Sequence, residues 1–275
     1  MSVIEAILFG LVQGLTEFIP VSSTAHIVIM GYVLDVQTPG LTFEIFLHIA
    51  SLLAVIIYFR QDIFQLATGL LNSFRAGAKE EDLVARRMVV YLGVATVITG
   101  VLGVILMKLL GDSIKSPTLV VCALLTTAVL LVLVERAKKL GDRGPGNLSM
   151  LDAIVVGLAQ TVAILPGISR AGSTLIAGLA LGMNRVTAVR FSFLLSIPVL
   201  AGSAVLALKD VSGGDLAEIG TTGLVVSFIV SFIASLASIV WMIRMLGQRR
   251  LYWFSVYLVI LAIYVFVAFP PEAVF

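Results

Sequence analysis

The chain has 275 residues, of which 60% are hydrophobic and 12% are charged, and its mean hydropathy is +1.12. These values exclude an ordinary water-soluble domain and are typical of a polytopic membrane protein. The net charge is only +2 and the basic residues lie in connecting segments, which excludes a nucleic-acid-binding surface, and the single cysteine, Cys122, excludes an intrachain disulfide.

The first two apolar segments, at about 3–19 and 22–34, are shorter than the roughly 20 residues that a membrane-crossing helix needs. A polar loop that contains Pro20 joins them. We therefore predict a re-entrant helix–loop–helix hairpin, with a continuous kinked span as the alternative. A loop at that depth is stable only inside protein or beside a cavity, because lipid offers its backbone no hydrogen bonds. The polar side chains of this hairpin are candidate site residues: Gln13, Glu17, Ser22, Ser23, Thr24 and His26.

Three longer apolar runs follow, at about 41–59, 86–110 and 117–135, and each is long enough to cross a bilayer. Between the first two runs, apolar residues from Ile63 to Phe74 recur at helical spacing, which predicts a short amphipathic helix on the inner membrane surface. Glu44 and His48 lie in the first run. A direct role in a site competes there with packing or a hydrogen bond at a helix crossing.

The second half of the chain repeats the first. Short segments at about 151–165 and 172–183 flank a loop with Pro166, and longer runs follow at about 189–208, 221–246 and 252–269. The stretch EAILFGLVQGLTEFIPVSS aligns with DAIVVGLAQTVAILPGIS, with one gap.

This repetition predicts an all-α polytopic membrane protein with six full transmembrane helices plus two re-entrant helix–loop–helix hairpins. Because three crossings reverse the side of entry, the second copy is expected upside down, as an inverted-topology repeat. Repeat 1 covers about 3–135 and repeat 2 about 151–269, within a single integral membrane domain of residues 1–275.

The basic residues divide between the two faces that this topology defines. The smaller set is Lys108, Lys115 and Lys209; the larger set is Arg60, Arg75, Lys79, Arg86, Arg87, Arg136, Lys138, Lys139, Arg143, Arg185, Arg190, Arg244, Arg249 and Arg250. Cytoplasmic loops carry the excess of Lys and Arg, so the larger set is expected inside. We predict a multi-pass protein of the plasma (inner) membrane, with both termini outside and the site open to the outer face.

The second hairpin adds a set of residues suited to phosphate: Ser169, Arg170, Ser173 and Thr174. An arginine at membrane depth needs an anion, and its guanidinium has a planar fork of donors that matches phosphate oxygens. The helix that follows each loop adds N–H groups at its N-terminus. The two loops together therefore predict a diphosphate site, although Ser and Thr at these positions also serve as ordinary helix caps.

The motifs QGLTEFIPVSSTAH (13–26) and LPGISRAGST (165–174), together with Phe43–Glu44, resemble those of the undecaprenyl-diphosphatases, membrane phosphatases associated with bacitracin resistance. The resemblance covers nearly the whole chain. It implies hydrolysis of undecaprenyl diphosphate to undecaprenyl phosphate and inorganic phosphate, which recycles the lipid carrier for cell-wall polymers, with dependence on Mg²⁺ or Ca²⁺. The chain departs from the family pattern at Gln13, where some members have glutamate, and at Ala171, where the pattern has serine.

We hypothesise that Ser23 attacks the terminal phosphorus, that Glu17 or His26 assists proton transfer, and that Arg170 stabilises the transferring phosphoryl group. His26 as the nucleophile and a water activated by Glu17 are rival mechanisms. Phosphate-binding roles are assigned to Gln13, Ser22, Thr24, Ser169, Arg170, Ser173 and Thr174, and a metal-binding role is considered for Glu17.

A second functional class stays open. An inverted repeat is also typical of transporters, so a transporter or flippase of a polyprenyl phosphate lipid is the alternative function. The expected partners are a polyprenyl diphosphate substrate and membrane lipids, with no nucleic acid, and a homodimer is the assembly considered.

Overall fold

The structure is a computed structural model that describes residues 1–34, 36, 40–111, 116–136, 141–207, 219–247 and 251–269. The elements in these ranges are helices, joined by turns and one isolated bridge between Arg143 and Met183. The predicted all-helical fold is confirmed for this part of the chain. The basic residues Lys115, Lys138, Lys139, Lys209, Arg249 and Arg250, named above for the topology, lie outside the described residues.

Each of the two predicted helix–loop–helix hairpins is formed by a pair of short helices. The first consists of α1 (Val3–Glu17) and α2 (Ser23–Val33), and the second of α7 (Met150–Val162) and α8 (Arg170–Ala180). Both begin with the same capping box: the Ser2 hydroxyl accepts from the Glu5 N–H, and the Ser149 hydroxyl accepts from the Asp152 N–H. The similarity between the two halves of the chain therefore includes the N-terminal cap of each hairpin.

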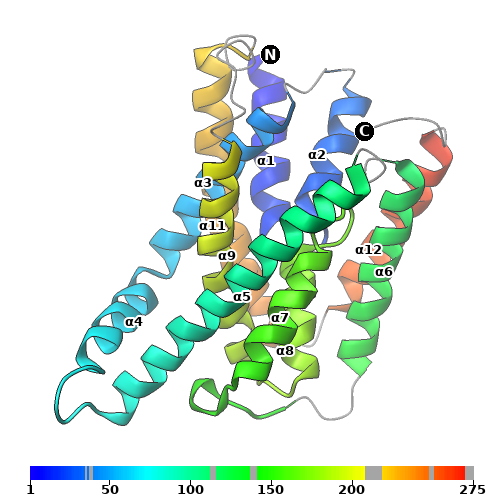
Figure 1. Ribbon diagram of the computed structural model, residues 1–275. Helices are drawn as coiled ribbons and strands as arrows, with labels where there is room; N and C mark the ends of the chain where they lie inside the picture. Colours follow the sequence, from blue (N-terminus) through cyan, green and yellow to red (C-terminus); the bar gives the residue numbers. More distant parts are fainter. Residues whose placement is uncertain are drawn as a thin grey trace.

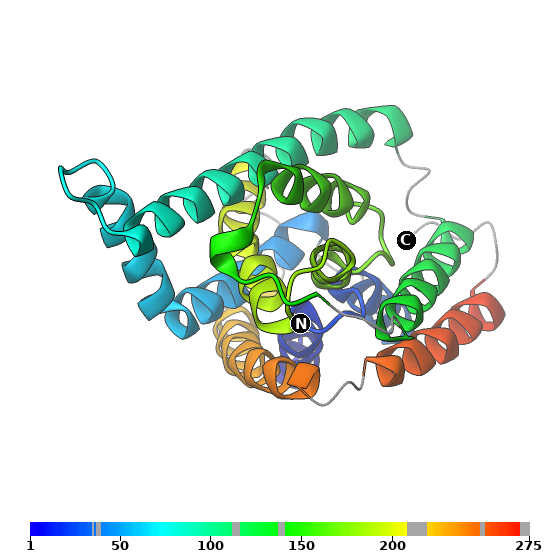
Figure 2. The ribbon, with the colours of Figure 1, turned by 90° about the horizontal axis from the view of Figure 1, so that it is seen from below.

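The hairpins approach one another from opposite ends of the molecule. In Figure 1 the free ends of α1 and α2 lie at the top, those of α7 and α8 lie toward the bottom, and the two loops meet between them. The loops are in direct contact, because the Gly167 N–H donates to the Ser22 hydroxyl at 3.1 Å. Seen along the helices in Figure 2, the hairpins lie within a surround that includes α5 (Glu80–Leu110), α6 (Pro117–Arg136), α11 (Thr221–Gly247) and α12 (Tyr252–Ala268).

Among the described residues, four helices are long and apolar enough to cross a membrane: α5, α6, α9 (Arg185–Ala207) and α11. The count rises to five if α3 (Gly40–Tyr58) and α4 (Arg60–Asn72), which are bent by 69° relative to each other, are taken together as one broken span. The amphipathic helix predicted from Ile63 to Phe74 corresponds to α4. The last predicted span, 252–269, forms α12, whose 17 residues place it among the shorter apolar helices.

Three helices begin two or more residues earlier than their apolar runs predicted: α5, α8 and α9, which starts at Arg185 rather than near residue 189. α5 starts at Glu80 rather than near residue 86, because Glu80, Glu81 and Asp82 form its first turn, where acidic side chains interact favourably with the helix dipole. α8 starts at Arg170 rather than at 172, because the Ser169 hydroxyl accepts from the Gly172 N–H and caps the helix there. Hydropathy alone does not detect polar first turns.

Each hairpin is fixed by one closely packed neighbour. α1 packs on α11, where a Cβ added to Gly10 or Gly14 would lie 2.6 or 2.4 Å from the carbonyl oxygen of Ser227 or Ser231. α7 packs on α5 through Gly157, whose added Cβ would lie 3.0 Å from Ala95. Small residues allow such close contact, which holds helices together where lipid removes the hydrophobic driving force.

Hydroxyl groups strengthen the interface that positions α1. The Ser238 hydroxyl of α11 donates to the Gly14 carbonyl at 2.8 Å, and the Ser235 hydroxyl donates to Ser51 of α3 at 2.9 Å. These serines are fully buried, so their hydroxyls need partners inside the bundle. The last turn of α1, which carries Glu17, is therefore held on one side by α11.

We predict that Gly14→Ala destabilises the protein by about 1–3 kcal/mol, because the new methyl group meets the backbone of α11 and forces the helices apart. Gly93→Ala is the matched control: nothing lies within 4 Å of a Cβ at Gly93 in α5, so this change should be neutral or stabilising by up to about 1 kcal/mol. Thermal unfolding in detergent measures both. Equal melting temperatures for the two variants would contradict the packing assigned to α1 and α11.

Candidate functional site

The site is built around Glu17, the last residue of α1. Its side chain is buried, and its Oε2 accepts from the Gln13 amide at 3.0 Å and from the Ser23 hydroxyl at 2.7 Å. Nε2 of His48, on α3, lies 3.2 Å from the same oxygen. Gln13 is one turn before Glu17 on the same helix face, and Ser23 begins α2 across the loop. One carboxylate thus gathers groups from three helices.

Arg170 reaches the same carboxylate from the second hairpin. Its Nη2 pairs with Oε1 of Glu17, and its guanidinium carbon lies 5.9 Å from the centre of the Phe18 ring. Nη1 is buried and has no hydrogen-bond partner among the described residues. A buried guanidinium N–H without an acceptor is costly, so this atom is ready to bind an anion that enters the site.

The first loop holds Ser22 in a strained conformation. Ser22 has φ of 69°, in the left-handed region that costs a non-glycine residue roughly 1–2 kcal/mol. Two contacts hold it there: Nδ1 of His26 lies 2.7 Å from the Ser22 carbonyl oxygen, and the Gly167 N–H bonds to its hydroxyl. The turn brings Ser23 back toward Glu17.

These residues surround a cavity of about 240 Å³ between the two hairpins. Six of the residues predicted from sequence line it: Glu17, Ser22, Ser23, Thr24, Ser169 and Arg170. Both loops contribute, as do α3 through His48 and α9 through Ser203. Apolar side chains line part of the cavity, and its polar lining consists of hydroxyls, one carboxylate, one guanidinium, one imidazole and one amide, a set that suits a small anion.

Four predicted residues do not line the cavity. Gln13 lies behind Glu17, to which it donates. Thr174 donates to the Arg170 carbonyl at 3.0 Å and contacts Ser192, and Ser173 is half-buried in the first turn of α8. His26 faces the last helix: its Nε2 lies 2.6 Å from the Tyr257 hydroxyl, and the two rings are stacked. Both ring nitrogens of His26 are therefore engaged outside the cavity.

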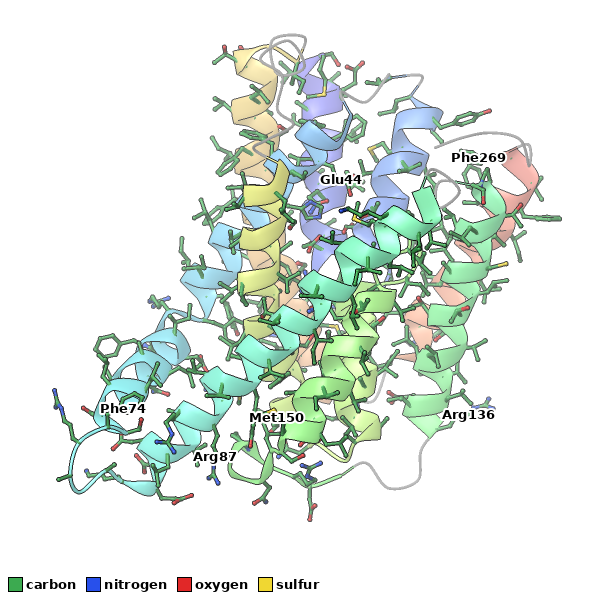
Figure 3. The ribbon with its side chains drawn as sticks, in the orientation of Figure 1. Glu44, Phe74, Arg87, Arg136, Met150 and Phe269 are labelled. Carbon is green, nitrogen blue, oxygen red and sulfur yellow. The ribbon has the colours of Figure 1, made fainter. Side chains whose placement is uncertain are left out.

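The structure adds residues that the sequence motifs did not single out as site residues. For His48 the sequence left two roles open, a direct role in a site or packing at a helix crossing. In the structure His48 contacts Glu17 and lines the cavity. Thr99 of α5 and Gln160 of α7 also line it, and the Thr99 hydroxyl accepts from the Gln160 amide at 3.0 Å, which links the two helices. Glu44, which Figure 3 labels, is partly buried and lies one helical turn before His48 on α3. The sequence feature that could have indicated a site role for His48 is the pair of polar residues, Glu44 and His48, in a mostly apolar helix.

Comparison with known proteins places this arrangement in a family. Residues 6–264 match the family described as bacitracin resistance protein BacA. Undecaprenyl-diphosphatase 2 of Halalkalibacterium halodurans is 48% identical over 270 residues, covering 98% of this chain and 97% of the relative. Undecaprenyl-diphosphatase 1 of Shouchella clausii is 42% identical, covering 97% and 96%, and the undecaprenyl-diphosphatase of Oceanobacillus iheyensis is 39% identical, covering 97% and 96%.

We predict that Glu17→Gln destabilises the protein by about 3–5 kcal/mol, because it leaves the Arg170 guanidinium buried without a carboxylate. The double change E17Q/R170M removes both charges and should recover much of that loss. Thermal unfolding in detergent measures each variant.

The matched control for this prediction is Glu80→Gln, at the exposed Glu80–Arg87 pair. This pair should contribute only about 0–1 kcal/mol, because water screens it. If E17Q shifts the melting temperature no more than E80Q does, the buried pair assigned between the hairpins is wrong.

Proposed function

The chain belongs to the bacitracin resistance protein BacA family, and on that basis we propose that it hydrolyses undecaprenyl diphosphate to undecaprenyl phosphate and inorganic phosphate. The names of its relatives, undecaprenyl-diphosphatases over nearly their full length, support this activity. The reaction returns the lipid carrier of cell-wall polymers to use. The chain is accordingly a multi-pass membrane hydrolase that acts on a lipid.

One observation carries the proposal. The Ser23 hydroxyl donates to the Glu17 carboxylate at 2.7 Å. Beside this pair, Nη1 of the buried Arg170 has no acceptor among the described residues. A nucleophile within hydrogen-bond reach of a base, next to a cation that can hold phosphate oxygens, is what phosphoryl transfer requires. A carrier that only moves the lipid needs the cation but has no use for a serine paired with a carboxylate, so the transporter alternative is not favoured.

The reaction then proceeds in two steps. Ser23 Oγ attacks the terminal phosphorus and its proton passes to Glu17. As the bond to the bridging oxygen breaks, Glu17 passes that proton to the departing oxygen, which releases undecaprenyl phosphate and restores the carboxylate. Water next attacks the phosphoserine with Glu17 as the base, which releases inorganic phosphate and restores the serine. Nη1 of Arg170 and the N–H groups that begin α8 face the charge that develops on the phosphoryl oxygens.

His26 and His48 take supporting roles in this scheme. His26 holds the strained Ser22 carbonyl and is itself held by Tyr257, so we assign it to positioning the loop rather than to attack. His48 lies against Glu17 Oε2, where it orients the carboxylate toward Ser23. A water activated by Glu17 is the remaining rival to Ser23 as the nucleophile.

We propose that a divalent cation, Mg²⁺ or Ca²⁺, acts together with the substrate and would be held by Gln13 and Glu17 at the edge of the cavity. Oε1 of Gln13 is buried without a hydrogen-bond partner among the described residues, next to the Glu17 carboxylate, and hard cations prefer oxygen ligands. No three His, Cys, Asp or Glu side chains converge in the described part of the chain, so diphosphate oxygens would complete the coordination, as is common for Mg²⁺. Bound there, the ion would neutralise charge on the diphosphate.

The predicted membrane arrangement has support from the packing. α1 packs on α11 and α7 packs on α5, and these pairs occupy equivalent places in the two halves of the chain, while α3 packs on α9 and α6 on α12. An inverted repeat with two re-entrant hairpins would produce these pairs. In Figure 3, Arg87 and Arg136 lie at the end opposite Phe269, in keeping with a basic cytoplasmic face and termini outside. A homodimer stays a prediction.

We predict that Ser23→Ala lowers phosphate release from undecaprenyl diphosphate by on the order of 10³-fold, since it removes the nucleophile. Arg170→Lys keeps the charge but loses the planar fork, and it should cost on the order of 10²-fold. Ser203→Ala, a hydroxyl that lines the cavity but bonds to the Val199 carbonyl, is the control and should retain activity. Undiminished turnover by S23A would favour attack by water instead.

We also predict that Gln13→Glu lowers the Mg²⁺ concentration needed for half-maximal activity, because a second carboxylate joins Glu17. Gln13→Leu, which has no oxygen ligand, should raise it. The two variants are compared by phosphate release at increasing Mg²⁺ and by Mn²⁺ binding followed with electron paramagnetic resonance. Identical metal dependence in both would contradict a ligand role for Gln13.

A further inference from the structure

A second hollow opens next to the catalytic cavity, on the other side of α1. It is an apolar groove of about 400 Å³ between the first hairpin, α11 and α12. Its walls include Leu15, Ile19, Val21, Trp241, Trp253 and Tyr257. These residues are hydrophobic or aromatic, so the groove suits a hydrocarbon chain and not a charged group.

Two features link this groove to the catalytic site: a shared lining residue and a hydrogen bond. Thr16 lines both the groove and the cavity of Glu17, so the two spaces adjoin at this residue. The Thr16 hydroxyl donates to the Val12 carbonyl at 2.6 Å within its own helix, so it needs no other hydrogen-bond partner where the two spaces adjoin. Tyr257, on the groove wall, bonds to His26, which stands three residues after Ser23 in the first turn of α2.

A larger apolar groove elsewhere lacks these links. It has a volume of about 730 Å³ and lies between α6 and α12, with Val129, Leu133, Val256 and Ile260 among its lining residues. It shares no lining residue with the cavity of Glu17. Volume alone would favour the groove between α6 and α12 as the binding site for the prenyl chain. The groove beside α1 is favoured because it adjoins the cavity of Glu17.

We propose that the groove lined by Leu15, Ile19, Val21, Trp241, Trp253 and Tyr257 binds the isoprene units of the substrate nearest its diphosphate. The inference rests on the proposed hydrolysis and identifies the subsite that selects a prenyl chain. With the diphosphate held at Arg170, the chain must leave the cavity beside apolar side chains, and the groove that adjoins the cavity at Thr16 supplies them. Chain and headgroup are then bound on two faces of the same helix.

The chain provides its own reporter for this groove, because it has two tryptophans, Trp241 and Trp253, and both line the groove. The probe is a brominated farnesyl methylenediphosphonate, which resists hydrolysis and whose bromine quenches nearby tryptophan emission. In wild-type protein we expect saturable quenching that unlabelled analogue reverses. Brominated farnesol, which lacks the diphosphonate, should quench only weakly and without saturation.

Two outcomes would overturn the inference. Equal quenching by both brominated compounds would mean that ordinary lipid fills the groove, and inhibition of phosphate release by the diphosphonate without quenching would place the chain elsewhere. The second outcome leaves the proposed function standing. Absence of phosphate release from any prenyl diphosphate by wild-type protein would instead remove the function itself.

A pair of narrowing variants tests the subsite by kinetics. Leu15→Trp should lower kcat/KM for farnesyl diphosphate by at least about tenfold, mostly by raising KM. The same variant should change kcat/KM for isopentenyl diphosphate by less than about twofold, because a single isoprene unit makes few contacts in the groove. Ile260→Trp narrows the other groove and should alter neither substrate. Equal losses for both substrates in L15W, or a farnesyl-specific loss in I260W, would contradict the assignment.

Discussion

The structure depends on one contact inside an apolar bundle, the pair formed by Glu17 of the first hairpin and Arg170 of the second. Neither charge is stable alone at that depth, because removing an ion from water costs several kcal/mol unless a partner compensates. Each hairpin therefore carries half of a neutral unit. The requirement that the halves meet brings together two loops that are about 150 residues apart in sequence.

The same contact explains why the site is assembled before substrate arrives. Close packing of Gly14 on α11 and of Gly157 on α5 sets the depth of each hairpin, and the serine and threonine hydroxyls around them are satisfied. At the site one buried donor stays without an acceptor among the described residues, Nη1 of Arg170. In the proposed function, a diphosphate would supply the acceptor that this N–H lacks. Catalysis can then depend on positioning and electrostatics.

Much of this arrangement was readable from the sequence, because the signals were periodic or repeated. Apolar runs located the helices, and the paired Pro and Ser motifs located Glu17, Ser23 and Arg170, which the structure brings together. His26 lay in the same motif, but its direction depends on Tyr257, which is 231 residues away and carries no signal of its own. His48 and Thr99 reach the cavity from helices whose faces are fixed only by tertiary packing. Single polar residues in apolar spans could not be assigned to the site without that geometry.

The meeting of the two hairpin loops can be measured directly with a disulfide. A Cβ at Gly172 would lie 3.2 Å from the Cβ of Pro20, close to the roughly 3.5–4.5 Å of a disulfide, and C122A removes the chain's own cysteine. In a P20C/G172C/C122A variant, mass spectrometry of the unreduced digest should find positions 20 and 172 linked in most molecules, and a reductant should separate them. Free thiols at both positions in folded protein, with the linked peptide absent after oxidation, would show that the loops do not meet and that the shared pocket does not exist.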